Sequence, residues 1–339
     1  MRLTELDYEL PEELIAQEPQ ATRDEARLLV VRRRGGQIEH SRFYKLPRLL
    51  ADGDLLVLND TRVIPARLFA RKESGARVEL LLVRPLPEPA GAWLALARTH
   101  RPLRDDTRLL LDGDAALRVV GYTRPGRPIV ISANAAAMDE IIGRHGILAL
   151  PHYIQRPPRE SDLTDYQTVY AGHAGAIAAP TAGLHFTERL FGELTEAGVR
   201  TATVTLHIGP GTFAPLRAPE VESHTMESEW FTIPEATLAA IDHARRVGGR
   251  VIAVGTSSVR ALESYAVTGD REGFTGLFIS PGFRFKLIDA LLTNFHMPRT
   301  TVLALVMAFA GRDLTLDAYR AAIRHRYRFL SYGDAMLIL

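Results

Sequence analysis

The chain has 339 residues, 46% of them apolar and 24% charged, which is typical of a soluble globular protein with about two domains. Its 41 basic and 40 acidic residues leave a net charge of only +1, so it is no bulk polycation. The absence of cysteine excludes disulfides, thiolate metal sites and a cysteine nucleophile. No apolar run approaches the ~18 residues of a membrane span, and the acidic start Leu3–Glu18 is unlike a signal peptide. We therefore expect a cytoplasmic protein.

The first 65 residues predict two strands followed by a polar loop. Leu28–Arg32 is the first strand, and Asp54–Asn59 reads as a strand buried on both faces. The second strand leads directly into Asp60–Arg67. A polar cluster at the end of a buried strand is where α/β proteins place ligand groups. The alternative is a turn in which Asp60 and Thr61 bond their own backbone.

Residues 66–148 change character and predict a small antiparallel β-barrel. Short β-rich runs follow one another between Gly, Pro and Asp-Gly turns, and the helix Ala135–Arg144 closes the segment. Since the flanking parts mix helices and strands, we expect a discontinuous mixed α/β catalytic domain (1–65 and 149–339) with the barrel inserted. From Arg67 to Arg144 there are 13 basic and 9 acidic residues, and arginines also crowd Arg320–Arg328. Both segments suit an acidic partner.

Two loops of similar composition each carry one histidine. Pro180–His185 and His207–Phe213 are rich in Gly, Pro and Thr, and they flank a predicted helix, Phe186–Ala197, and a predicted strand, Val199–Leu206. Their glycines and prolines shape the backbone, while their threonines and histidines supply polar groups. This arrangement indicates a site rather than a scaffold.

The strand Arg250–Val254 precedes a turn, Gly255–Ser258, that opens the predicted helix Val259–Tyr265. Free backbone N–H groups at such a helix start bind anions or hydroxyls. The alternative is plain N-capping by Ser257 or Ser258. Arg260 lies in the first turn, where the helix dipole disfavours a cation, and a binding role would explain that position.

The C-terminal part predicts further elements of a mixed fold. Thr232–Glu235 resembles a capping box that begins a helix reaching Arg246, and Leu277–Ser280 is a predicted strand. The polar loop Asn294–His296 precedes the apolar helix Thr301–Ala310. An amphipathic helix is expected at about Leu316–Arg328.

The motifs of several enzyme classes are absent. The histidines show no zinc-ligand spacing, no Gly-x-Ser-x-Gly elbow occurs, and no complete Gly-x-Gly-x-x-Gly fingerprint is present. What remains is four polar loops at strand ends, rich in His, Arg, Thr and Asn. Such a cleft suits an anionic or nucleoside-like substrate.

Six strings of residues, in this order, resemble the S-adenosylmethionine:tRNA ribosyltransferase-isomerase family of queuosine biosynthesis. They are Asn59–Arg67, Ala179–Phe186, Val204–Phe213, Val251–Arg260, Thr293–Pro298 and Tyr327–Met336. The resemblance runs from Leu10 to Met336. One departure is visible: where the family usually has a second histidine in the turn that begins at His224, this chain has Glu227.

The resemblance implies a reaction and its partners. Such an enzyme transfers and isomerises the ribosyl group of S-adenosylmethionine onto 7-aminomethyl-7-deazaguanine at the tRNA wobble position. The products are epoxyqueuosine in tRNA, adenine and methionine. No metal or redox cofactor is implied, and we expect a monomer. The alternatives are a methyltransferase that uses the same donor, and a non-catalytic RNA-binding module.

Residue roles follow as hypotheses. His207 or His185 is the general base, the other histidine positions adenine or acts as an acid, and Asp60 is the alternative base. The other polar-loop residues are expected around the substrates: Thr181, Gly183, Gly209, Gly211 and Thr212 at the donor, Thr256, Ser257 and Arg260 at the methionine carboxylate or a tRNA phosphate, and Arg62, Arg67, Asn294 and His296 at the tRNA.

Overall fold

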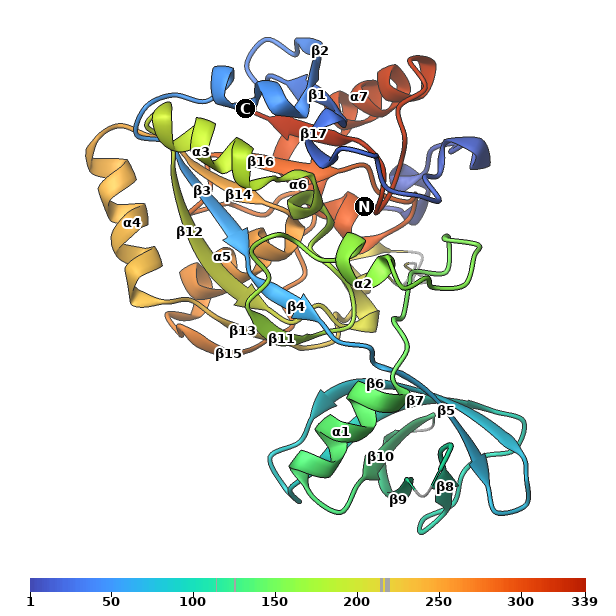
Figure 1. Ribbon diagram of the computed structural model, residues 1–339. Helices are drawn as coiled ribbons and strands as arrows, with labels where there is room; N and C mark the ends of the chain where they lie inside the picture. Colours follow the sequence, from blue (N-terminus) through green and yellow to red (C-terminus); the bar gives the residue numbers. More distant parts are fainter. Residues whose placement is uncertain (114, 125, 214–215, 217–219) are drawn as a thin grey trace.

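The structure is a computed structural model that describes every residue except 114, 125, 214–215 and 217–219. A mixed nine-stranded sheet forms its larger part (Figure 1). From one edge to the other the strands are β15 (Glu272–Thr275), β13 (Glu229–Thr232), β12 (Arg200–Leu206), β3 (Leu55–Asn59), β14 (Val251–Val254), β16 (Ala290–Asn294), β17 (Ala335–Ile338), β1 (Arg27–Val31) and β2 (Ile38–Arg42). The four central strands β12, β3, β14 and β16 are parallel. Their carboxyl ends therefore meet at one edge of the sheet.

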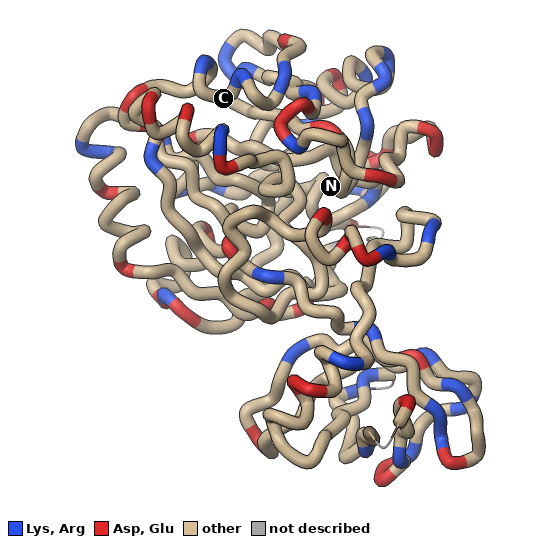
Figure 2. Tube along the Cα trace, in the orientation of Figure 1, with Lys and Arg blue, Asp and Glu red and all other residues tan. Residues whose placement is uncertain are grey.

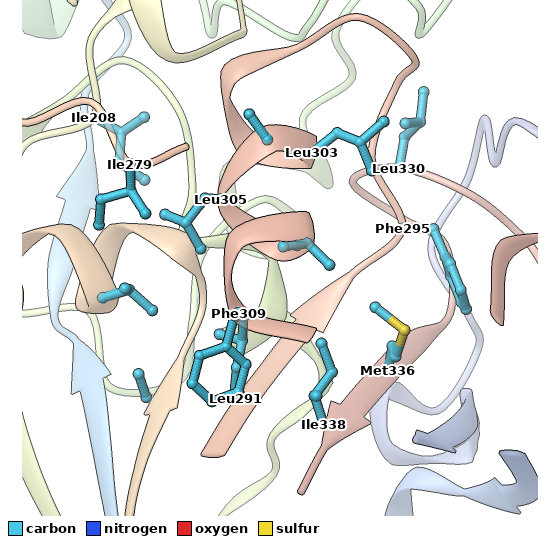
Figure 3. Packing of buried hydrophobic residues seen from close by; sticks show 14 of the residues in the cluster. Ile208, Ile279, Leu291, Phe295, Leu303, Leu305, Phe309, Leu330, Met336 and Ile338 are labelled. Atoms are coloured by element: carbon cyan, nitrogen blue, oxygen red, sulfur yellow. The ribbon is translucent and has the colours of Figure 1, made fainter. Parts of the chain in front are cut away.

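Side chains of the central strands alternate between two hydrophobic cores. On β3, Leu55 and Val57 belong to one core, whereas Leu56 and Leu58 belong to the other. Because both faces are buried, these strands read as continuous apolar runs in the sequence. Figure 3 shows part of the first core, where Phe309 of one covering helix lies near Leu291 of β16.

Helices cover both faces of the sheet. The first core takes apolar side chains from α4 (Glu235–Arg246), α5 (Thr256–Thr268), α6 (Thr301–Ala310) and α7 (Arg312–Arg324). The second core is covered by α3 (Glu188–Glu196), through Leu190 and Leu194. None of the helices within the described residues is long and apolar enough to cross a membrane.

A six-stranded antiparallel barrel is inserted after β4 (Thr61–Val63), as predicted (Figure 1). Its strands, in order around the barrel, are β10 (Arg127–Ile131), β7 (Ala92–Thr99), β6 (Arg77–Pro85), β5 (Arg67–Lys72), β8 (Arg108–Leu110) and β9 (Ala116–Arg124). The helix α1 (Ala135–His145) follows, and the barrel has its own hydrophobic core. The mixed α/β fold with an inserted barrel is therefore confirmed.

The two chain segments that enter and leave the barrel lie side by side. Arg67 and Ile147 exchange backbone hydrogen bonds of 3.0 and 2.8 Å. Gly146 is needed at this crossing, because a Cβ there would lie 2.2 Å from the Pro65 carbonyl oxygen. After the crossing come the short helix α2 (Asp162–Asp165) and the strand β11 (His173–Ala176), which pairs in parallel with β4.

Some predicted elements are wrong in position. Leu277–Ser280 forms no strand, because the edge strand β15 ends at Thr275 and the Thr275 hydroxyl accepts the Leu277 N–H at 3.1 Å. The last helix is shifted toward the N-terminus, to Arg312–Arg324. The sequence patterns predict none of the strands β2, β4, β5, β11, β13, β15, β16 and β17.

The two predicted caps are also wrong. Thr232 ends β13 and does not cap α4, whose N-cap is Pro234 without a side-chain bond. The helix α5 begins at Thr256, directly after Gly255, which has a φ of 86°. Ser257 and Ser258 therefore lie inside the helix, and the Ser258 hydroxyl donates to the Val254 carbonyl at 2.7 Å.

Candidate active site

A buried asparagine joins three of the elements that meet at the carboxyl edge of the sheet. The side-chain amide of Asn59, at the end of β3, donates to the Leu206 carbonyl at 2.9 Å and to the Ser257 hydroxyl at 3.0 Å. Its carbonyl accepts the N–H groups of Leu206 (3.0 Å) and Thr61 (3.2 Å). Asn59 thereby fixes the strand ends from which the polar loops leave. The Ser257 hydroxyl thus accepts a hydrogen bond from within the protein.

A cavity of about 260 Å³ lies where the barrel meets this edge of the sheet. It is lined by Val83, Arg84 and Pro85 from the barrel, and by Gly175, His207, Gly209, Ser228, Glu229, Trp230 and Phe274 from the larger domain. The predicted residues His207 and Gly209 are therefore brought to one cavity. The walls are mostly apolar and aromatic, as in many small-molecule sites.

The imidazole of His207 is held on three sides. It stacks on Trp230, with ring centroids 5.0 Å apart and planes inclined by 23°. Its Nδ1 is 2.8 Å from the Thr61 hydroxyl. Gly175 packs against the ring so closely that a Cβ there would lie 2.6 Å from Nε2. This leaves the ring little freedom to change orientation.

Burial keeps His207 neutral. Desolvation, and then the neighbouring His173, lower the pKa of His207 to about 4, although Asp60 acts in the opposite direction. At neutral pH the ring therefore carries a free lone pair. Asp60 is itself buried and accepts the Thr205 hydroxyl at 2.6 Å, and its other oxygen is 3.2 Å from Nδ1 of the exposed His173.

Glu229, which was not among the predicted site residues, organises the second histidine loop. Its carboxylate accepts the Gly209 N–H at 2.7 Å and the Thr212 hydroxyl at 2.6 Å. It also forms a buried ion pair with Arg260. Because α5 begins at Thr256, Arg260 lies in its second turn and not, as predicted, in the first, and it has an internal partner. Thr212 and Arg260 hold the loop in shape and do not line the cavity.

A second, smaller cavity lies further along the same edge, beside β16. About 20 Å³ in volume, it includes Thr181, Asn294 and His296 in its lining. Nε2 of His296 is 2.9 Å from the Thr293 hydroxyl, and burial of the ring lowers the pKa of His296 to about 3. Three of the predicted site residues, from two distant loops, therefore line one cavity. It is not the cavity that His207 lines.

His185 lies in the second hydrophobic core and is not brought to His207. Its Nε2 is 3.0 Å from Oδ1 of Asn294, and its ring packs on Phe43 with centroids 4.9 Å apart. Burial lowers the pKa of His185. The residue borders a separate cavity of about 100 Å³ that also contains Arg23 and Ser331.

The other predicted residues line neither of the first two cavities. A Cβ at Gly183 would lie 2.0 Å from the Tyr170 hydroxyl oxygen, and one at Gly211 would lie 2.9 Å from Cβ of Glu227, so both glycines serve close packing. Thr256 is buried in the first turn of α5. Arg62 is exposed on β4 and Arg67 faces Glu79 at 3.4 Å, both near the crossing into the barrel.

Sequence reasoning missed much of the His207 cavity. Glu229 and Trp230 directly follow the turn that begins at His224, so that turn was the available signal. Gly175 shows its importance only once the His207 ring is in place. The barrel residues Val83–Pro85 carry no local pattern that points to a site.

Comparison with known proteins identifies the family. Residues 3–338 match the model of the family described as queuosine biosynthesis protein. An S-adenosylmethionine:tRNA ribosyltransferase-isomerase of Rubrobacter xylanophilus is 51% identical over 100% of this chain and 98% of that protein. One from Thermotoga maritima is 47% identical over the full length of both chains.

A solved structure is also similar. The crystal structure of an S-adenosylmethionine tRNA ribosyltransferase from Thermotoga maritima covers 99% of this chain and 100% of its own, with 40% identity and a TM-score of 0.57. The chain therefore belongs to the queuosine biosynthesis protein family, within which these relatives are S-adenosylmethionine:tRNA ribosyltransferase-isomerases.

Proposed function

We propose that this protein is an S-adenosylmethionine:tRNA ribosyltransferase-isomerase that acts at the cavity around His207. It transfers and isomerises the ribosyl group of S-adenosylmethionine onto 7-aminomethyl-7-deazaguanine in tRNA, giving epoxyqueuosine, adenine and methionine. The observation that carries the assignment to this cavity is the neutral, immobilised imidazole of His207, placed where the barrel meets the sheet.

The first step of the proposed reaction needs only a weak general base. The sulfonium of the donor acidifies the adjacent C5′ protons of the ribose, so a neutral imidazole near it is sufficient to remove one. Elimination then expels adenine, which takes up a proton as it leaves. The aminomethyl nitrogen attacks the sugar and loses a proton, and closure of the epoxide expels methionine. Because the substrate brings its own positive charge, the proposal requires no metal.

The hydrogen bonds around His207 assign its tautomer. The Thr61 hydroxyl donates to the His173 carbonyl at 3.4 Å, and it therefore accepts the Nδ1–H of His207. Nε2 then carries the lone pair and takes the proton. Asp60 is the alternative base, but its Oδ1 is already bound to Thr205. His185, with its ring bound to Asn294, is proposed as a structural group.

The cavity walls suit the parts of the donor. The faces of Trp230 and Phe274 match a flat purine, and the guanidinium of Arg84 lies 4.9 Å above the Phe274 ring. Gly209 leaves room for the sugar beside His207. Thr212 and Arg260 act through Glu229 as positioning residues for this loop.

The second cavity and the barrel crossing are proposed to meet the tRNA. Thr181, Asn294 and His296 line this cavity, although Asn294 and His296 are bound to neighbouring groups of the protein, and Arg62 is exposed on β4. We further propose a monomer that works in the cytoplasm. The proposed domain boundaries, after residue 65 and before residue 149, are supported by the backbone pairing of Arg67 with Ile147.

One assay tests the function. The purified protein is incubated with S-adenosylmethionine and tRNA that carries 7-aminomethyl-7-deazaguanine, and the nucleosides and small products are analysed by mass spectrometry. Adenine, methionine and epoxyqueuosine are the expected products. S-adenosylhomocysteine would instead indicate a methyltransferase, and tRNA binding without a donor-dependent change of mass would indicate an RNA-binding module.

A further inference from the structure

The outer face of the barrel carries a groove that is separate from the cavity around His207. It has a volume of about 620 Å³ and is lined by Phe69, Ala70, Arg71, Arg77, Val78, Glu79, Arg98, Thr99, His100, Leu110 and Asp112. Phe69 points outward on β5 and is 55% exposed. An exposed aromatic ring in a groove offers apolar surface that a partner could cover.

Three arginines of the groove have no carboxylate partner. Arg71, Arg77 and Arg98 are exposed, and none forms an ion pair with any residue that the structure describes. Arg71 and Arg77 lie directly opposite each other across β5 and β6. Like charges in that position repel and destabilise the strand pair. A bound polyanion would remove this repulsion, since each guanidinium could then contact a phosphate.

The lining holds three arginines against two carboxylates, Glu79 and Asp112, and Glu79 lies directly opposite Arg98 across β6 and β7. Glu79 is engaged by Arg67, with Nε and Oε1 3.4 Å apart. Asp112 is the other carboxylate in the lining. Basic positions are spread over the barrel in Figure 2. The groove is therefore a local positive surface on a chain whose net charge is only +1.

Strand β6 joins this groove to the proposed active site. Arg77, Leu81 and Val83 face outward, while the intervening side chains at 78, 80 and 82 are buried in the barrel core. From Arg77 to Val83 the strand covers roughly 20 Å at ~3.4 Å per residue. The pairing of β6 with β7 then shifts between Leu82 and Arg84, and Val83, Arg84 and Pro85 line the cavity of His207. Such shifts re-aim side chains beside active sites.

We propose that this groove binds the single-stranded anticodon loop of the tRNA and leads its wobble base toward His207. Phe69 stacks on an unpaired base, and Arg71, Arg77 and Arg98 contact backbone phosphates. Unpaired RNA bases are recognised by aromatic stacking, and the backbone by arginines along a groove. The inference rests on the proposed function, because that function makes tRNA the substrate.

The other arginine-rich segment is a weaker candidate surface. Arg320 pairs with Asp317 at 2.9 Å, and Arg326 lies 4.0 Å from Glu13. Arg328 donates to the Glu18 carbonyl. These cations have partners within the protein, and the one exposed ring beside them that the structure describes, His325, already packs on His40 at 4.1 Å. The segment therefore supplies a matched control of equal charge.

The test compares two triple variants with the wild type. In the first, Arg71, Arg77 and Arg98 are replaced by Ala; in the second, Arg320, Arg324 and Arg326 are. Binding of the substrate tRNA is followed by fluorescence anisotropy at several salt concentrations. The barrel variant should bind at least tenfold more weakly. Its plot of log affinity against log salt should be shallower by about 2, which is ~0.7 for each lost contact to a single strand.

Two further readings complete the test. Phe69→Ala should weaken tRNA binding about tenfold without changing the salt slope, because stacking is not ionic. The KM for tRNA should rise in both barrel variants, in step with the loss of binding. Circular dichroism and thermal melting confirm that these exposed substitutions leave the fold intact.

The outcomes separate this inference from the proposed function. Wild-type affinity and slope in the barrel variants, or a loss confined to the control variant, would overturn the groove as the RNA surface. If instead the wild-type protein binds the tRNA through the groove but forms no epoxyqueuosine, the proposed function fails and the surface stands.

Discussion

The two histidine loops are alike in sequence and opposite in environment. Both follow the pattern of Gly, Pro, Thr and one His, yet His185 packs on Phe43 of the second core and borders a separate cavity, while His207 borders the cavity between the barrel and the sheet. His185 is bound to an amide of the neighbouring strand β16. His207 is stacked, bound through Nδ1 alone, and keeps Nε2 free. Loop composition thus marks places where the backbone must bend, and only the surroundings decide whether a histidine performs chemistry.

Removal of the His207 imidazole should have the largest effect on activity. His207→Gln is expected to lower kcat by about 10²–10⁴-fold, the usual contribution of a general base, while donor binding and folding persist. Single-turnover release of adenine is the measurement. His185→Gln is the matched control and should retain activity within a few-fold. Full turnover by His207→Gln would contradict the assignment of His207 as the general base.

A variant that displaces the His207 imidazole without removing it should lose somewhat less activity than His207→Gln. In Gly175→Ala the new Cβ would lie 2.6 Å from Nε2 of His207, and Gly175 has a φ of 154°. The ring must move, and a shift of ~1 Å at a reacting group costs about 10²-fold in rate. The kcat and the melting temperature of the variant are both measured. A fall in kcat without a comparable fall in melting temperature is the expected result. Gly172→Ala, where the nearest atom is 4.0 Å away, is the control and should remain active.

His185 should matter for stability more than for catalysis. His185→Ala leaves a cavity beside Phe43 and removes the partner of the Asn294 carbonyl, at a cost of roughly 2–4 kcal/mol of unfolding free energy. Urea unfolding measures the loss, and the folded variant should keep its kcat. His185→Gln retains a donor for Asn294 and should lose less. A stable His185→Ala protein without turnover would assign His185 to the chemistry.

The pH dependence of stability gives a smaller, signed prediction. The pKa of His207 is about 4 in the folded protein, below the ordinary value of 6.5, because burial disfavours the charged ring. The unfolded chain therefore binds a proton more readily between these values. The folded protein should lose ~1–3 kcal/mol through this residue as pH falls from about 6.5 to about 4, and none above. In His207→Gln that part of the slope should vanish, and an unchanged slope would contradict the depressed pKa.

Chelation should have the smallest effect. Since the sulfonium supplies the positive charge, the proposed reaction should proceed at the same rate after dialysis against EDTA. Adenine release before and after dialysis is the measurement, with restoration by added Mg²⁺ or Zn²⁺ as the control. A rate that falls with EDTA and returns with one metal would show that the account of the chemistry is incomplete.

The fold could be predicted further than the site. Buried strands such as β3 and β14, and the turns between barrel strands, leave clear local patterns, so the mixed α/β sheet and the inserted barrel were foreseen. Short strands at or next to the sheet edge, such as β15 and β13, do not stand out, because partial burial gives them no continuous apolar run. The start of α5 was misjudged because Gly255 begins the helix without a side-chain cap.

The candidate site depended on contacts between distant residues. His207 and Gly209 were singled out from their loop, but Trp230, Glu229 and Gly175 act on that loop across other strands. Nothing local distinguishes the His185 loop from the His207 loop. The sheet order and the position of the inserted barrel set the surroundings of each histidine. Neither can be read from the sequence of either loop.

A structure of the complex with S-adenosylmethionine, or with a stable analogue, tests the central claim most directly. The account predicts the ribose in the cavity between the barrel and the sheet, with C5′ about 3–3.5 Å from Nε2 of His207, the separation of a reactive geometry. A donor seated instead beside His185, or with C5′ nearer to Asp60 than to His207, would contradict it.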